Sequence, residues 1–261
     1  MNKEQIVLSL GALALVVILY QLPRSVVEND QLQEVGMSDE HSFEIPEEIQ
    51  SQIVALRSSI KTEENFDKKT NFAHSLARAY LDFGVLDSAV RYAEAIESWN
   101  EEESREAADI YFTAFERSPS SDQGTVYATK AREIITVLLE KDPEDLFLKN
   151  RLAMTLVASE NPMAGISMLR EIVAQDENNR LAILNLGLLS IQSGQFDRAR
   201  GRFEKLVSLD TTDNEAKLYL AVSIMELDQP SQARLLLEEI LASSDSIPAI
   251  KVMAMDYLEA L

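Results

Sequence analysis

The chain has 261 residues, of which 46% are hydrophobic, and its 44 acidic and 24 basic side chains give a formal net charge of −20. A chain this acidic repels the phosphate backbone of nucleic acids, and no basic face offsets the charge, so we expect no nucleic-acid partner. The absence of cysteine excludes disulfides, thiolate metal sites and cysteine catalysis.

The apolar segment at residues 6–22, IVLSLGALALVVILYQL, contains no charged residue. As a helix it would span roughly 26 Å, close to the ~30 Å hydrocarbon thickness of a bilayer. We therefore predict a single-pass membrane protein with a transmembrane anchor at 6–22, after a short N-terminal tail at 1–5. A cleaved signal peptide is the alternative interpretation, but the exit from Tyr20 to Arg24 lacks the small residues of a cleavage site.

Residues 23–45 follow the anchor and carry six carboxylates with few apolar side chains, a composition typical of a solvated acidic linker. The basic residues on the two sides of the anchor, Lys3 and Arg24, are nearly balanced and leave its orientation open. We expect the amino terminus in the cytoplasm and the bulk of the chain on the extracytoplasmic (periplasmic) side.

The rest of the chain, 46–261, shows helical periodicity. Apolar residues recur at helical spacing after Pro46, which predicts a single helix at 46–61. Between residues 146 and 248 one pattern of apolar and small residues returns at 34-residue steps. Its strongest copy starts at Arg180 and has its signature residues at Ile183, Leu186, Gly187, Gly194, Ala199, Phe203 and Leu206.

This period and pattern resemble the tetratricopeptide repeat, which has a Leu-Gly pair in its first helix and Ala-x-x-x-Phe in its second. Leu186-Gly187 and the pair Ala199 and Phe203 carry the resemblance, although no copy has the family's Trp. The resemblance implies an all-α, TPR-like α-solenoid of antiparallel helix pairs, in which no repeat buries its apolar face alone.

The 34-residue frame places five repeats, at 70–103, 104–145, 146–179, 180–213 and 214–247. The second is eight residues too long, and we place the excess in an enlarged loop at 118–125, SPSSDQGT, between its two helices. The helix at 46–61 is interpreted as a cap on the first repeat. A helix at 248–261 would cap the other end, and its apolar residues also suit homo-oligomerisation through this C-terminal helix.

No catalytic, cofactor or metal site is expected. The two histidines, His41 and His74, lack the paired spacing of metal ligands. The S-x-x-K spacing from Ser58 to Lys61 lacks the companion motifs of acyl-transfer enzymes. The carboxylates are spread as solvated faces, so no acid–base pair can be nominated. We therefore expect a protein that is not an enzyme and has no cofactor.

The resemblance implies a binding surface instead: a concave groove, lined by the first helices of the repeats, that accepts a peptide or a partner helix. Asn185 matches the family position whose side-chain amide often bonds the backbone of a bound peptide. The candidate partner-binding residues are Met154, Asn185, Leu188, Ile191, Val222 and Met225. His74 and Arg78 would lie in the first-repeat part of the groove. Leu184 and Leu218 either line the groove or pack against the neighbouring first helix.

Together these features predict a membrane-anchored TPR scaffold or adaptor that binds a protein partner and organises a membrane-associated complex. The alternative is an accessory, chaperone-like factor for protein export or envelope assembly that holds client polypeptides. That alternative rests on an analogy between folds. The sequence does not identify the partner.

Overall fold

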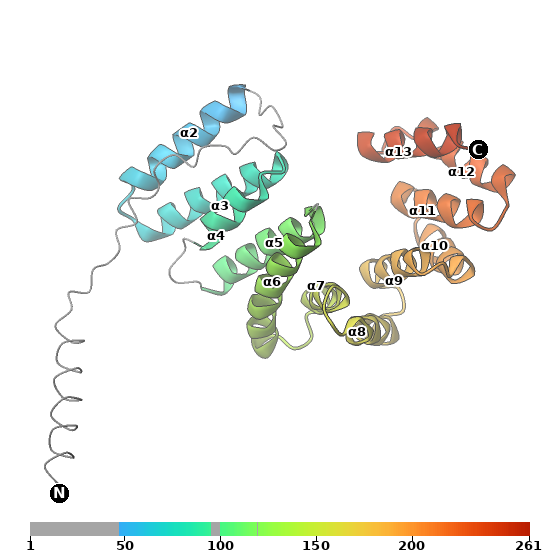
Figure 1. Cartoon of the computed structure of the whole chain (residues 1–261), viewed down its shortest axis with the longest axis horizontal. Helices are drawn as coiled ribbons and strands as arrows, with labels where there is room; N and C mark the ends of the chain where they lie inside the picture. Colours follow the sequence, from blue (N-terminus) through green and yellow to red (C-terminus); the bar gives the residue numbers. More distant parts are fainter. Residues whose placement is uncertain (1–46, 95–99, 119) are drawn as a thin grey trace, which may run out of the picture. The chain divides into compact units, whose positions relative to one another are not determined.

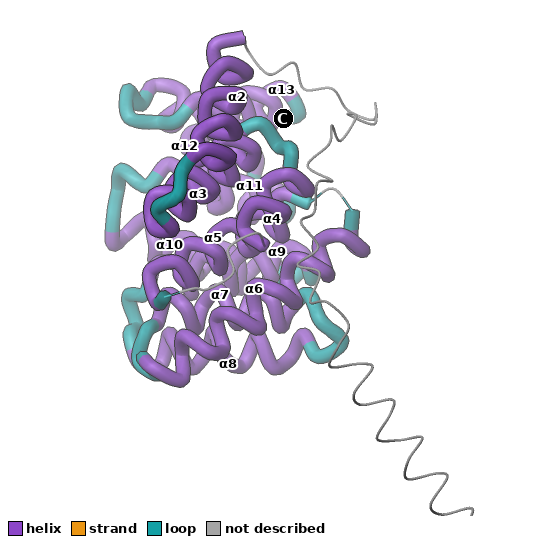
Figure 2. The backbone as a smooth tube through the Cα atoms, turned by 90° about the vertical axis from the view of Figure 1, so that its left-hand side faces the viewer, coloured by secondary structure: helices purple, strands orange, loops and turns teal. Residues whose placement is uncertain are grey.

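The structure is a computed structural model, in which residues 47–94, 100–118 and 120–261 are described. Within these ranges the protein is all-α, with twelve helices and no strand (Figures 1 and 2). The membrane anchor predicted at 6–22 and the linker predicted at 23–45 lie outside the described residues. No helix of the described ranges has both the length and the apolar character that crossing a bilayer requires.

The helices, in chain order, are α2 (Glu47–Thr62), α3 (Phe66–Asp82), α4 (Leu86–Glu94), α5 (Glu101–Arg117), α6 (Ser121–Lys141), α7 (Leu146–Val157), α8 (Pro162–Gln175), α9 (Arg180–Gln192), α10 (Phe196–Leu209), α11 (Asn214–Met225), α12 (Pro230–Ala242) and α13 (Pro248–Glu259).

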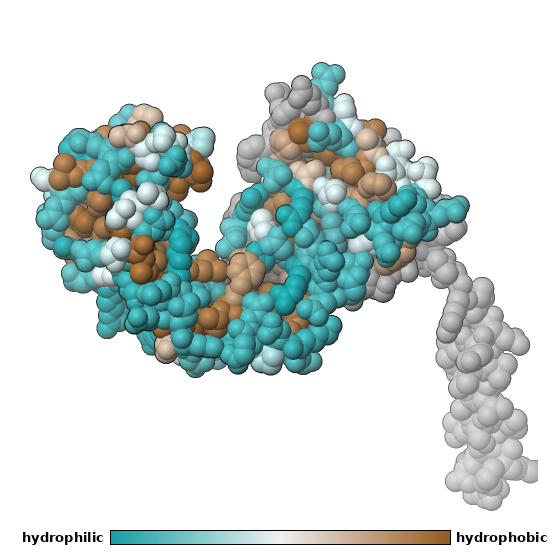
Figure 3. Space-filling model, turned by 180° about the vertical axis from the view of Figure 1, so that it is seen from behind, coloured by the Kyte–Doolittle hydropathy of each residue, from teal (hydrophilic) through white to brown (hydrophobic). Residues whose placement is uncertain are grey.

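Each of these helices packs against the next one along the chain, as Figure 1 shows. The first helices of successive pairs also touch, because α3 contacts α5, α7 contacts α9, α9 contacts α11 and α11 contacts α13. The apolar side chains lie between the helices, and the surface seen in Figure 3 is largely hydrophilic with apolar residues among the polar ones. The prediction of an all-α solenoid of antiparallel helix pairs is confirmed.

The starts of the first helices follow the 34-residue step. Helices α7, α9, α11 and α13 begin at residues 146, 180, 214 and 248, where the predicted repeats and the terminal helix begin. Asp145, Asn179 and Asp213 precede three of them, and each accepts a hydrogen bond from the backbone N–H three residues on, at 2.9, 3.1 and 3.0 Å. Such N-caps satisfy backbone donors that a helix leaves unpaired, which fixes where these helices start.

Two of the three cap residues also hold the preceding first helix. The second carboxylate oxygen of Asp145 lies 2.7 Å from the Arg105 guanidinium of α5. Asp213 lies 2.7 Å from the guanidinium of Arg180, the first residue of α9. One carboxylate therefore caps its own helix and ties it to the first helix of the repeat before it.

A close approach between the two helices of a pair depends on small residues. A methyl group on Gly187 of α9 would lie 2.5 Å from the ring of Phe203 on α10, and one on Gly165 of α8 would lie 2.3 Å from the carbonyl oxygen of Ala153 on α7. Phe203 is fully buried by this packing. The small residues that the sequence pattern singled out therefore set the spacing of the pairs.

The enlarged loop predicted at 118–125 is wrong. Helix α5 ends at Arg117 and α6 begins at Ser121, so most of the predicted loop is the first part of α6. The extra length lies in the helices, since α5 and α6 have 17 and 21 residues whereas α7 and α8 have 12 and 14. Gln123 and Tyr127 donate hydrogen bonds to Asp87 of α4, and these contacts hold the first turns of α6 against the preceding helix pair.

We expect Gly187→Ala to lower the free energy of unfolding. The added methyl group overpacks the contact with Phe203 at a cost of about 1–3 kcal/mol, which exceeds the helix-propensity gain of about 1 kcal/mol. Chemical denaturation would measure the change. In a Phe203→Leu background the penalty should shrink, because the opposing ring is gone.

Gly201→Ala is the matched control, because nothing lies within 4 Å of a methyl group at that exposed position in α10. It should raise the free energy of unfolding by roughly 0.5–1 kcal/mol. Equal effects of the Gly187 and Gly201 substitutions would contradict the close-contact explanation.

Candidate functional site

The structure distributes the predicted groove residues over α7, α9 and α11. Met154, Leu188, Ile191, Val222 and Met225 are half-buried, and all of them except Val222 pack against the hydrophobic core. Leu184 and Leu218, for which two interpretations were open, are 6% and 0% exposed and belong to the core. The apolar side chains of these helices thus serve packing first, and their remaining exposed area is small.

Asn185 is buried rather than free. Its side-chain amide donates a 2.6 Å hydrogen bond to the Asn150 side-chain oxygen, which joins α9 to α7. The Nδ2 group of Asn150 is itself buried without a partner in the described part of the chain. An amide pair placed in this way stabilises the contact between two first helices, and it engages one of the two N–H groups of the Asn185 side chain.

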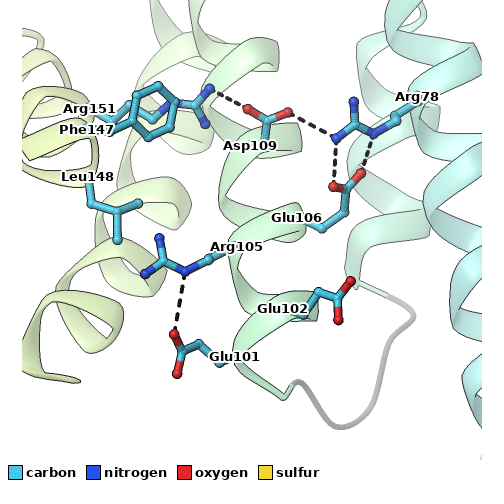
Figure 4. A pocket seen from close by; sticks show the side chains of 9 residues that line it. All are labelled: Arg78, Glu101, Glu102, Arg105, Glu106, Asp109, Phe147, Leu148 and Arg151. Carbon is cyan, nitrogen blue, oxygen red and sulfur yellow. Dashed lines mark hydrogen bonds and ion pairs between the residues drawn. The ribbon is translucent and has the colours of Figure 1, made fainter. Parts of the chain in front are cut away.

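A hollow of about 610 Å³, which the sequence analysis did not predict, opens on the first helices α3, α5 and α7 (Figure 4). It is lined by Arg78, Glu101, Glu102, Arg105, Glu106, Asp109, Phe147, Leu148 and Arg151. Three successive repeats therefore contribute side chains to one concave surface.

Ion pairs that cross from helix to helix organise this hollow, as the dashed lines in Figure 4 show. Arg78 of α3 donates to both carboxylate oxygens of Glu106 on α5 and lies 3.6 Å from Asp109. Arg151 of α7 pairs with the same Asp109 from the other side. Asp109 is thus shared by two arginines from different repeats, so the lining is a connected network.

Aromatic contacts fix the α7 side of the hollow. The Arg151 guanidinium carbon lies 4.5 Å from the centroid of the Phe147 ring and 4.8 Å from that of Phe112. These are cation–π distances, and they hold the guanidinium between two rings. Phe147 nevertheless remains 53% exposed, so most of its apolar surface is available in the hollow.

The lining is net negative, because three arginines face four carboxylates. Glu102 forms no ion pair with any described residue, and Figure 4 shows it without a partner among the side chains drawn. The hydrogen bond from Arg78 lowers the pKa of Glu106. Every arginine of the hollow is already paired, so the unpaired charge that it offers is a carboxylate.

His74 lies on α3, one turn before Arg78. Burial lowers its pKa below the ordinary value, although Glu106 and Glu103 act in the opposite direction. Its Nε2 atom is buried and has no hydrogen-bond partner within the described residues. The folded protein therefore favours the neutral imidazole.

The charged hollow escaped sequence analysis for a physical reason. The ion pairs that join different helices of the hollow connect residues 28 to 42 positions apart, so they depend on how the repeats are stacked. Arg78 was expected in the groove, but no sequence pattern linked it to Glu106 and Asp109 of α5.

We expect the free energy of unfolding to decrease as the pH falls below about 6.5, the ordinary histidine pKa, because the unfolded chain then binds a proton that folded His74 resists. The decrease should level off below the lowered pKa of the folded state. Carboxylates whose pKa is lowered, such as Glu106, lose their contribution only at more acidic pH. Denaturation measured between pH 7.5 and 5 should show a smaller loss in His74→Gln, and an identical loss would contradict this origin.

Comparisons with known proteins agree with this architecture. Residues 190–254 match the sequence model of the tetratricopeptide repeat family. A tetratricopeptide repeat protein from Parabacteroides merdae is 16% identical, with a TM-score of 0.56 over 81% of this chain and 82% of that one. A thermophilic TPR protein from Thermus thermophilus is 13% identical, with a TM-score of 0.51 over 68% of this chain and 91% of that one.

A further solved structure, YrrB, described as a TPR protein with an unusual peptide-binding site, is 18% identical with a TM-score of 0.42 over 79% of this chain and 98% of that one. None of the curated proteins compared with the chain is significantly similar to it. The described part of the chain therefore has the all-α solenoid fold of tetratricopeptide repeat proteins, and residues 190–254 match that family in sequence.

Proposed function

We propose that this protein binds a segment of another protein along the face formed by its first helices, with the hollow on α3, α5 and α7 as the main contact. The hollow itself carries the proposal. Its volume of about 610 Å³ lies within the usual range of binding pockets, ~300–1,000 Å³, and its walls come from three repeats. A surface of this kind suits an extended or helical segment rather than a small metabolite.

The chemistry of the hollow favours a segment that carries both a basic and an apolar side chain. The exposed face of Phe147 would pack on the apolar group. Glu102, at the start of α5, would receive the basic one, because Glu101 beside it is already paired with Arg105. The arginines are less suited to bind an acidic segment, because each would first have to give up a carboxylate partner.

The half-buried residues Met154, Leu188, Ile191, Val222 and Met225 extend this contact surface toward the C-terminal repeats. We retain them as candidate partner-binding residues, because their side chains keep exposed area on the same layer of first helices. Methionine adapts to apolar partners of different shape, which favours Met154 and Met225 for this role.

The membrane role is part of the same proposal. An anchor at 6–22 and an acidic linker at 23–45 would tether the repeats near a bilayer on its extracytoplasmic side. The protein would then act as a scaffold that brings its partner to the membrane, without catalysis of its own. The apolar sequence of 6–22 is the observation that supports the tether.

We expect Phe147→Ala to weaken partner binding about tenfold or more, as is usual when an exposed aromatic anchor is removed from an interface. Purified protein panned against a library of displayed peptides of known sequence would give the ligands, and titration of the enriched peptides would give their affinities. The enriched peptides should be basic, and Glu102→Lys should remove that preference.

Val137→Ala is the matched control, since Val137 is equally exposed, at 55%, but lies on the second helix α6. It should leave affinity unchanged. Enrichment of acidic peptides, or equal losses in the Phe147 and Val137 variants, would contradict the proposed site.

We also expect Met225→Glu and Val222→Glu to reduce capture of the natural partner by the full-length, membrane-extracted protein while helicity stays unchanged. A buried carboxylate at an apolar contact must be desolvated, which penalises the complex. Affinity capture followed by mass spectrometry and circular dichroism would measure both effects. A loss of helicity would instead show that these two residues serve the core.

A further inference from the structure

Helix α13 carries exposed apolar side chains. Val252 and Met255 are 55% and 48% exposed and lie away from Ile250 and Ala254, which are buried against the preceding repeat, while Met253, 36% exposed, lies at the edge of the buried side. Each earlier first helix of the array is covered by the elements that follow it in the stack. Three exposed apolar side chains on one short helix therefore indicate a surface that another element covers.

The 34-residue frame shows what kind of surface this is. Val252 occupies the position of Leu184 in α9 and Leu218 in α11, which are 6% and 0% exposed. Leu184 and Leu218 are buried in the core because the helices that follow them in the stack cover them. At α13 the equivalent apolar side chain is present, but no described helix covers it.

The second helix of another repeat does not fit on α13. Met255 stands where α9 has Gly187 and α11 has Ala221, the small residues that let a second helix approach. A methyl group on Gly187 would already lie 2.5 Å from Phe203, so the longer Met255 side chain blocks that mode of packing. A helix that packs against this surface must therefore contact the Met255 side chain and stay farther from the α13 backbone than a second helix of a repeat does.

The charges on either side of Met255 identify such an occupant. Lys251 lies four residues before it and Glu259 four residues after it, on the same ridge of the helix. Neither side chain pairs with any described residue. The two lie roughly 12 Å apart along the axis. When a second, antiparallel α13 crosses at Met255, each Lys251 meets the Glu259 of the other copy, so the surface is complementary to itself.

We propose that α13 binds the α13 of a second copy of this chain, antiparallel about a two-fold axis that passes between the two Met255 side chains. Such an interface is isologous, so it closes at the dimer. A 12-residue helix offers less than the ~800 Å² per partner of a stable complex. The dimer should therefore form reversibly and depend on protein concentration.

Single cysteines test the geometry directly, because the chain has none of its own. In the detergent-extracted full-length protein, Met255→Cys should form an intermolecular disulfide under mild oxidation, since the two copies of this position meet at the axis. Ala249→Cys is the matched control, because it is exposed on the same helix but points about 120° away. It should give several-fold less disulfide.

Equal cross-linking at the two positions would show non-specific association, for example through the N-terminal segment, and would overturn the proposal. Absence of cross-linking at Met255→Cys would overturn it as well. Circular dichroism of both variants should match that of the parent chain, which separates failure to pair from failure to fold.

A charge exchange tests the pairing by sedimentation velocity. Lys251→Glu should raise the dimer dissociation constant by roughly fivefold, the size expected for two symmetric exposed ion pairs. Adding Glu259→Lys to that variant should restore dimerisation. Failure of the double variant to recover would rule out the antiparallel pairing, and a parent chain that stays monomeric at every concentration would show that a different protein or lipid covers α13.

Discussion

The close approach of the two helices in each pair is the constraint on which the rest of this structure depends. Gly187 lets Phe203 enter the space between α9 and α10, and Gly165 lets α8 pass over the backbone of α7. Once the second helices lie this close, the first helices fall into a layer in which side chains from successive repeats meet. The hollow on α3, α5 and α7, and the buried Asn150–Asn185 pair, are consequences of that layer.

The features that could be predicted from the sequence are those that recur locally. The N-caps Asp145, Asn179 and Asp213 repeat at the 34-residue step, and each defines a helix start through a contact within one turn. The second repeat departed from the pattern because its helix length is set by a distant contact, in which Gln123 and Tyr127 bond Asp87. Local composition at 118–125 favoured a turn, and tertiary hydrogen bonds outweighed it.

The residues that line the hollow differ from the partner-binding residues predicted from the sequence. The family resemblance implied a groove on the first helices, and most of the apolar residues chosen there pack against the core. The hollow on α3, α5 and α7 is lined by arginines and carboxylates, most of which pair with residues of other repeats. Such pairs leave no periodic trace, because Arg78, Glu106 and Asp109 occupy unrelated positions of their own helices. The solenoid fold could be predicted from the repeat pattern, whereas the ion pairs could be identified only once the three-dimensional positions of the helices were known.

The cap carboxylates link the initiation of one helix to the presence of another. Asp213 starts α11 through its bond to the Ala216 N–H and at the same time holds Arg180 of α9, and Asp145 does the same for α7 and α5. If one repeat unfolds, the first helix of the following repeat loses its apolar contacts, and its N-cap carboxylate also loses its arginine partner. Unfolding of one repeat is thereby transmitted to the following one, and the array gains cooperativity beyond that of hydrophobic stacking alone.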